Sequence, residues 1–138
     1  MGLTPEQMDA FLDRHFAHER DDDVEGVLAT LAPDVTHDVI GWPPGPSHGH
    51  GEARRFYETL FADLADGRVV SRWRRYGATF MVDESVWTGR AQGRPFGLDG
   101  RGRPLEFRLL HVIDFTPDGR IAREQVWVDL AAIQAQLA

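Results

Sequence analysis

The stretch that decides the fold is residues 103–129, which read RPLEFRLLHVIDF-TPDGR-IAREQVWVD. Two apolar-rich runs flank a turn, because Asp118-Gly119 favours a tight hairpin and Pro117 cannot donate a hydrogen bond to a strand ladder. The pattern predicts two antiparallel strands, over about 104–115 and 120–129.

Alternation sorts the side chains of these strands onto two faces. One face of each strand is mostly apolar and is interrupted once by an ionisable group, His111 on the first strand and Glu124 on the second. An ionisable group on an apolar face costs free energy unless it is paired, so these two residues mark a candidate site. The predicted inner residues are Phe107, Leu109, His111 and Ile113 on the first strand, and Ala122, Glu124, Val126 and Val128 on the second.

Three ionisable residues are the candidate catalytic groups. Glu124 is predicted to be a general base, because apolar surroundings raise a carboxylate pKa toward neutrality. His111 can act as an acid, a base or a donor to a substrate carbonyl, and His37 can complete the lining from an earlier strand. The structural alternatives are a Glu124 that pairs with an arginine and a His111 that is a satisfied core histidine. These residue types also suit a metal, but nothing in their spacing enforces one, so no metal site is predicted.

The composition is that of an ordinary soluble domain. A chain of 138 residues fits one domain with one core, and a net charge of −7 argues against nucleic-acid or anionic-membrane partners. Cysteine is absent, which excludes disulfides and thiolate chemistry. No segment resembles a signal peptide or a membrane span, so we expect a cytoplasmic protein.

Helical patterns dominate the first half of the chain. Thr4, Pro5 and Gln7 form a helix start with a capping box, followed by an apolar stripe that includes His15. The acidic run 21–23 is expected to end this helix and cap a second one, which stops at Pro33. A short strand over 35–40 follows. The Gly- and Pro-rich segment 41–51 is predicted to be a loop at the pocket rim, with Trp42 folded inward and His48 and His50 in the loop.

The second half of the chain reads as strands. A helix over about 52–64 leads, through an Asp66-Gly67 turn, into strands over 68–76 and 78–88. A glycine-rich connection over 89–102 precedes the hairpin, and a short helix over 130–137 closes the chain. This order predicts an α+β fold, a cone-shaped curved antiparallel sheet with helices on its concave face. Such a cone can hold a pocket between sheet and helices.

Several short motifs resemble those of a known family in order and spacing. They are Pro33-Asp34-Val35-Thr36-His37, the Gly51-Glu52-Ala53 helix opening with Phe56-Tyr57, and Asp118-Gly119-Arg120-Ile121 followed by Glu124, Trp127 and Asp129. Together they resemble the SnoaL-like branch of the nuclear-transport-factor-2-like superfamily, which includes polyketide cyclases. The similarity covers nearly the whole chain and implies a single domain over 1–138, a cone with a deep pocket, and a homodimer formed through the sheet.

The resemblance also implies positions for the site. The acidic base of the cyclases falls at Val126 here, and Glu124 stands where they carry a histidine. His111 matches a pocket histidine if the longer Thr116-Pro117 loop is treated as a gap, and His37 stands at a pocket asparagine. The related limonene epoxide hydrolases use an Asp-Arg-Asp set, of which only Asp83 is retained, with Met81 at the arginine position. Epoxide hydrolysis through that set is therefore disfavoured.

The leading hypothesis is a small cofactorless enzyme, a cyclase, isomerase or hydrolase, that acts on a mostly apolar oxygenated compound such as a polyketide. The alternatives are a binding protein with the same pocket and no chemistry, and a domain that only dimerises. In the leading hypothesis Glu124, His111 and His37 are catalytic. The residues expected to bind the substrate are Trp42, Tyr57, Trp87, Phe107, Leu109 and Val126.

Overall fold

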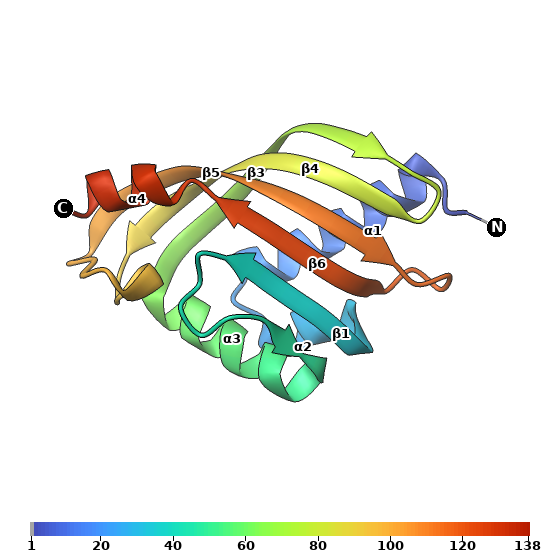
Figure 1. Cartoon of the computed structure of the whole chain (residues 1–138), viewed down its shortest axis with the longest axis horizontal. Helices are drawn as coiled ribbons and strands as arrows, with labels where there is room; N and C mark the ends of the chain where they lie inside the picture. Colours follow the sequence, from blue (N-terminus) through green and yellow to red (C-terminus); the bar gives the residue numbers. More distant parts are fainter. Residues whose placement is uncertain (1) are drawn as a thin grey trace.

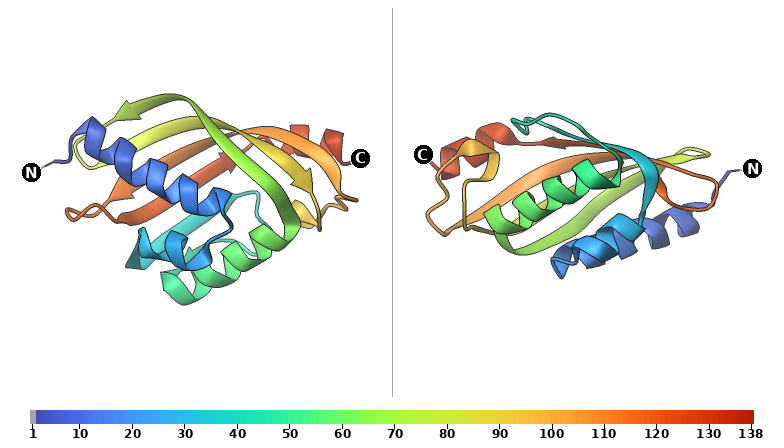
Figure 2. Two further views of the ribbon diagram at one scale, coloured as in Figure 1. Left: turned by 180° about the vertical axis from the view of Figure 1, so that it is seen from behind. Right: turned by 90° about the horizontal axis from the view of Figure 1, so that it is seen from below.

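A computed structural model describes residues 2–138 of the chain. Its helices and strands follow one another as α1 (Pro5–Arg20), α2 (Val24–Ala29), β1 (Leu31–Ile40), β2 (Ser47–His48), α3 (Gly49–Asp63), β3 (Leu64–Tyr76), β4 (Phe80–Ala91), the 3₁₀ turn η1 (Pro95–Gly97), β5 (Arg103–Phe115), β6 (Ile121–Val128) and α4 (Leu130–Gln136). The predicted α+β class is confirmed. Figure 1 shows a curved sheet with α1, α2 and α3 on the far side, and Figure 2 shows these helices from behind and from below.

The sheet has six strands in the order β2-β1-β6-β5-β4-β3. Four neighbouring pairs are antiparallel, as predicted, but β1 and β6 run parallel. An antiparallel sheet throughout was therefore a wrong expectation. The reason is the chain path, because β2, α3 and then β3, β4 and β5 intervene before β6 returns beside β1 in the same direction. This pair matters for the site, since it aligns His37 with Glu124.

The hairpin of β5 and β6 has the predicted faces, with one exception. Its turn uses Gly119 at φ 87°, and an added Cβ there would lie 2.3 Å from the Phe11 ring. Ile121 was expected on the outer face but is buried. The register shifts between Asp114 and Phe115, so that Ala122 is an extra residue and Ile121 turns inward.

The predicted helix caps are present. Thr4 and Gln7 form the capping box of α1, and Asp23 accepts a hydrogen bond from the Gly26 amide at the start of α2. Asp129 caps α4 in the same way, through the amide of Ala132. Each cap satisfies an amide at the start of its own helix, which has no partner within the helix.

Several predicted boundaries were wrong. The segment 41–51 is not a loop throughout, because Ser47–His48 pairs with β1 and α3 already begins at Gly49. β1 begins at Leu31 and runs through Pro33. The Asp66-Gly67 turn is a bulge inside β3, where Asp66 has φ 56° and the register with β4 shifts. β4 extends to Ala91 instead of ending at Thr88. None of the helices within residues 2–138 is long and apolar enough to cross a membrane.

Candidate active site

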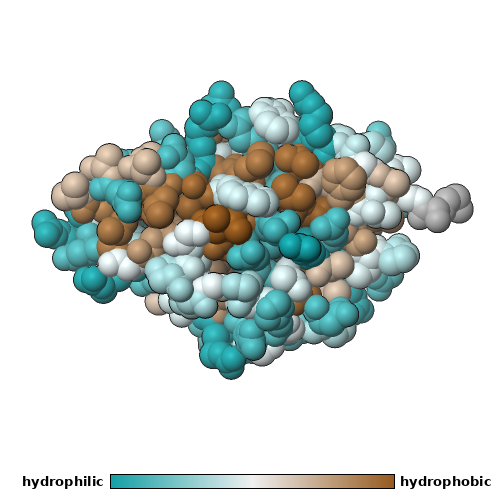
Figure 3. All heavy atoms as spheres, in the orientation of Figure 1, coloured by the Kyte–Doolittle hydropathy of each residue, from teal (hydrophilic) through white to brown (hydrophobic). Residues whose placement is uncertain are grey.

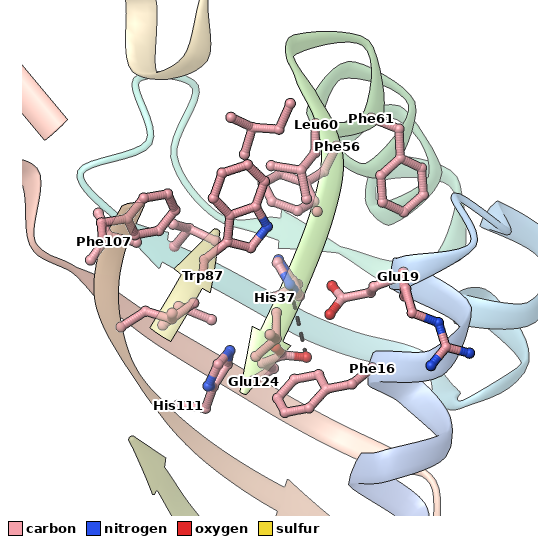
Figure 4. Close-up of a pocket in the computed structure, with 18 of the residues that line it drawn as sticks. Phe16, Glu19, His37, Phe56, Leu60, Phe61, Trp87, Phe107, His111 and Glu124 are labelled. Atoms are coloured by element: carbon pink, nitrogen blue, oxygen red, sulfur yellow. Dashed lines mark ion pairs between the residues drawn. The ribbon is translucent and has the colours of Figure 1, made fainter. Parts of the chain in front are cut away.

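A cavity of about 90 Å³ lies between the concave face of the sheet and helices α1 and α3. Figure 4 shows aromatic rings on its walls and the polar groups His37, His111, Glu124 and Glu19 among them. This volume is well below the roughly 300–1,000 Å³ of pockets for drug-sized ligands, so the cavity as it stands suits a small molecule. Its lining includes Phe16, Glu19, Arg20, Asp22, His37, Val39, Phe56, Leu60, Phe61, Trp87, Phe107, Leu109, His111, Glu124, Val126 and Val128.

Sheet register brings the polar groups together in two neighbouring rows. Glu124 on β6 lies between His37 on β1 and Ile113 on β5. In the next row, His111 lies between Val126 and Asp83 on β4. Neighbours in a row have side chains on the same face, so the three predicted catalytic residues share the cavity wall.

Glu124 pairs with a residue that we had not expected, His15 on α1. Nε2 of His15 lies 3.2 Å from Oε1 of Glu124, and both side chains are almost completely buried. Burial alone would raise the pKa of Glu124, but the positive charge of His15 outweighs it and lowers that pKa to about 2. The expectation of a carboxylate with a raised pKa was therefore wrong. The structural alternative was a Glu124 that pairs with an arginine. Glu124 does pair with a basic side chain, but that side chain is His15 and not an arginine.

The hydrogen bonds of His15 require its charged form. The Thr30 hydroxyl donates its only hydrogen to the carbonyl of Val27, at 2.6 Å. It must therefore accept from Nδ1 of His15, which lies 2.7 Å away. Nε2 faces the Glu124 carboxylate, which accepts only, so both ring nitrogens carry hydrogen. Although burial lowers the pKa of His15, the charges of Glu124 and Glu19 raise it to about 9.

His37 is a neutral imidazole in the same wall. Burial lowers its pKa more than the charge of Glu124 raises it. The hydroxyl of Tyr57 lies 3.1 Å from Nε2 of His37, and burial keeps this phenol protonated by raising its pKa well above the ordinary value. When this hydroxyl donates to Nε2, the hydrogen of His37 lies on Nδ1. This Nδ1 is buried and has no hydrogen-bond partner within residues 2–138, whereas Oε1 of Glu124 has the ion-pair contact with His15 described above.

His111 is held by Asp83, which is completely buried. Nδ1 of His111 lies 3.2 Å from Oδ1 of Asp83 and donates to it. Burial alone would raise the pKa of Asp83, but hydrogen bonds from His111, Ser71 and Ser85 hold it well below its ordinary value. An ionised Asp83 fixes the hydrogen of His111 on Nδ1, so Nε2 is the nitrogen available to a ligand.

Arg74 on β3 supplies the counter-charge of Asp83. Its Nε donates to Oδ2 of Asp83 at 2.9 Å, and its two terminal nitrogens donate to Asp9 at 2.9 Å and Asp13 at 2.7 Å on α1. The basic stretch 72–76 of β3 is thus ion-paired at Arg74. Through Arg74, helix α1 and strand β4 hold the Asp83–His111 pair in place.

The residues predicted to bind the substrate divide into two groups. Trp87, Phe107, Leu109 and Val126 line the cavity. Trp42 and Tyr57 are buried behind this lining. Trp42 packs edge-on against Phe56 and Phe96, and Tyr57 contacts His37. His50 bonds the carbonyl of Leu31, and neither it nor His48 is part of the cavity lining.

Sequence reasoning missed His15, Glu19 and Asp83 as members of the site. A signal existed for His15, because it interrupts the apolar stripe of its helix in the same way that His111 and Glu124 interrupt their strands. Asp83 alternates onto the same face as Met81 and Ser85, but nothing local showed that His111 would lie beside it. Among residues 2–138, no group of three or more His, Asp or Glu side chains is arranged to hold a metal ion.

The sequence comparison agrees with the fold and the cavity. Residues 6–137 match the family model described as SnoaL-like polyketide cyclase. The chain belongs to this family. No curated protein matches the chain in sequence.

Solved structures show that the family's fold is shared over the full chain. A protein from Jannaschia sp. CCS1, assigned as a SnoaL-like polyketide cyclase, superposes with a TM-score of 0.83 at 17% identity, covering 99% of this chain and 96% of the other. A protein from Xanthomonas campestris, assigned as a polyketide cyclase, gives 0.80 at 22% identity over 96% and 98%. An NTF2-like protein of unknown function from Burkholderia pseudomallei gives 0.80 at 23% over 96% and 98%. At these identities the likeness concerns the fold.

Proposed function

We propose that the protein is an enzyme that moves a proton on a small, mostly apolar, oxygenated compound, as in cyclisation or isomerisation next to a carbonyl. The observation that carries this proposal is the Asp83–His111 pair, in which Nδ1 of His111 is occupied at 3.2 Å and Nε2 is left for the cavity. A buried aspartate that orients an imidazole is a recurring arrangement for general acid–base catalysis. The family membership of the chain supports the same class of reaction.

His111 replaces Glu124 as the proposed base. Glu124 is tied to the charged His15, and a carboxyl with a pKa of about 2 is a weak proton acceptor. His111 has no such cation against its Nε2, and its position is fixed by Asp83 and Arg74. Since the aspartate expected of a cyclase is Val126 here, His111 is the remaining acid–base group of this row that lines the cavity.

His37 is proposed to bind the substrate oxygen. Its Nδ1–H is a buried donor without a partner among the residues described, and its ring lines the cavity. A carbonyl oxygen that accepts this hydrogen would gain negative charge more easily when a neighbouring carbon loses its proton. The Tyr57 hydroxyl keeps this donor in place, because it occupies Nε2 of His37 at 3.1 Å. Glu124 is then assigned a positioning role, as the partner of His15 beneath the reacting groups.

Exchange of α-hydrogens tests this proposal without knowledge of the natural substrate. Small cyclic ketones are incubated with the protein in D₂O, and loss of the α-proton signal is followed by NMR. The wild type is expected to accelerate exchange for some members of the set. His111→Gln, which keeps a hydrogen bond to Asp83 but removes the base, should lower the rate by about 10²–10⁴-fold.

The control variant is Arg108→Gln on the outer face of the sheet, which should exchange at the wild-type rate. Equal rates for His111→Gln and wild type would remove His111 from the mechanism. Glu124→Gln distinguishes the two candidate bases, because a larger loss there than in His111→Gln, in a protein that remains folded, would return the role of base to Glu124.

A binding protein without chemistry is the second candidate. Val126 at the position of the cyclase aspartate favours it, because the group that the resemblance implies as the base is replaced by an apolar side chain. Under this alternative, the ketones bind, but their exchange rates with protein equal those in buffer. Epoxide hydrolysis is not proposed, since Met81 stands at the arginine position and is completely buried.

A further inference from the structure

We infer that the substrate of this cavity carries a protonated or quaternary amine, whose cationic head lies between Glu19 and the aromatic walls. This inference rests on the proposed function in that it names the substrate class of the same site. Glu19 comes from the last turn of α1, and its side chain is 18% exposed. Figure 4 shows its carboxylate directed from the helix into the cavity.

The charges around the cavity do not balance. Two carboxylates share one cation here. Nε2 of His15 lies 3.2 Å from Glu124 and 3.7 Å from Glu19, and among the described residues no other ion-pair partner of Glu19 is found. When both carboxylates are ionised, one negative charge is left over in a largely apolar enclosure. Burial and the charge of Glu124 accordingly raise the pKa of Glu19, although His15 lowers it. The ammonium group of a ligand would neutralise the extra negative charge, so Glu19 would not have to bind a proton.

The mouth of the cavity is also acidic. Asp22 lines it, and burial together with the charges of Asp66 and Asp21 raises the pKa of Asp22. Arg20 is the one arginine in the described lining, which has no lysine, but its side chain is 53% exposed and its Nε lies 3.4 Å from Asp21. A field of this sign attracts cations to the entrance and repels anions.

The cavity walls are suited to an alkylated cation. Phe16, Phe56, Phe61, Trp87 and Phe107 all line the cavity. The faces of aromatic rings attract cations, most strongly in the case of tryptophan, and the attraction grows when water is excluded. The same lining also holds the surplus negative charge described above, with Oε1 of Glu124 buried 3.2 Å from Nε2 of His15. An ammonium with methyl or ring substituents meets both requirements, because its charge is spread over an apolar surface.

Two ligands of the same shape test this inference. Choline and 3,3-dimethyl-1-butanol differ in having a charged nitrogen or a neutral carbon at the centre of the trimethyl group. We expect titration calorimetry to show that the wild type binds choline at least about tenfold more tightly than the neutral alcohol.

Variants locate the effect. Glu19→Gln keeps the size of the side chain and should bring the affinity ratio close to one, and Trp87→Leu should lower the ratio. Glu58→Gln, which removes an exposed carboxylate on α3 outside the lining, should leave the ratio unchanged. The inference is overturned if the two ligands bind equally, if choline fails to bind at tens of millimolar, or if Glu19→Gln keeps the preference.

This binding test is independent of turnover. Loss of the choline preference with intact ketone exchange would overturn the substrate class alone. A choline preference without any ketone exchange would overturn the proposed reaction and leave the substrate class standing.

Discussion

Asp83 and Glu84 are neighbours on β4, and each pairs with an arginine, but they lie on opposite faces of the sheet. On the inner face, Asp83 is completely buried and its partner Arg74 is 12% exposed. On the outer face, Glu84 pairs with Arg108, whose side chain is 63% exposed. The inner pair has lost water on most sides and is stabilised only by its fixed partners. In the outer pair Glu84 is 11% exposed, but the Arg108 side chain lies largely in water.

The outer face differs from the inner face in a second way. It exposes large apolar side chains, among them Trp127 at 40% and Trp73 at 40%. Figure 3, in the orientation of Figure 1, shows hydrophobic side chains gathered across this side of the sheet. The inner face thus holds charge in an apolar enclosure, and the outer face holds apolar groups in water. The first arrangement suits chemistry, and the second suits association with another protein surface.

Replacing the arginine of each face should distinguish the inner ion pair from the outer one by the loss of stability. The loss on the inner face is the largest effect that we expect. Arg74→Met leaves Asp83 buried without its cation and should lower the free energy of unfolding by about 3–5 kcal/mol. Arg108→Met, the matched variant, should leave the denaturation midpoint nearly unchanged. Urea unfolding of both variants measures the difference, and equal losses would show that the two faces do not differ in the way described.

The pH dependence of stability probes the inner face at a second point. Folding raises the pKa of His15 from 6.5 to about 9, so its contribution is fully present below pH 6.5 and is lost as the pH rises through 9. The loss between pH 6 and pH 9 should be about 3 kcal/mol. Glu124, with a lowered pKa, acts in the opposite direction, and its contribution is lost only below its ordinary value of 4.5. His15→Gln should remove most of the alkaline slope, and an unchanged slope would contradict the pairing.

Association through the outer face is the smallest effect of the three. We propose a homodimer that buries at least about 1,000 Å² and has Trp127 near its centre. Trp127→Arg should weaken it by about 2 kcal/mol, or roughly 30-fold in the dissociation constant. Sedimentation velocity measures this, with Glu58→Arg as a surface control. A wild type that is monomeric at micromolar concentration would count against the dimer.

Much of the fold could be predicted from local patterns, because caps, turns and alternation are local properties. Thr4, Asp23 and the Asp118-Gly119 turn have the roles that their residue types predict. Alternation also placed His111 and Glu124 on one inner face. The bulges at Asp66 and Ala122 were not predictable, since a single extra residue in a strand leaves no clear pattern in its composition.

The partners of the site residues lie beyond local patterns for a different reason. His15 meets Glu124 only because of the angle at which α1 crosses the sheet, and Asp83 meets His111 only because of the register between β4 and β5. Likewise, His37 meets Glu124 through the parallel pairing of β1 and β6, which joins the first strand to the last. Such partners determine the pKa of each buried group. For this reason we assign the role of general base, which the sequence suggested for Glu124, to His111.

The central claim is that two inner histidines are held in different states, His15 as a fixed cation and His111 as a proton acceptor that faces the cavity. Nitrogen-15 NMR of the histidine side chains at pH 8 tests it directly, because the chemical shift of each ring nitrogen reports whether it carries hydrogen. We predict that both nitrogens of His15 are protonated, whereas the neutral tautomer of His111 carries its hydrogen on Nδ1, toward Asp83. A neutral His15, or a His111 with its hydrogen on Nε2, would contradict the account.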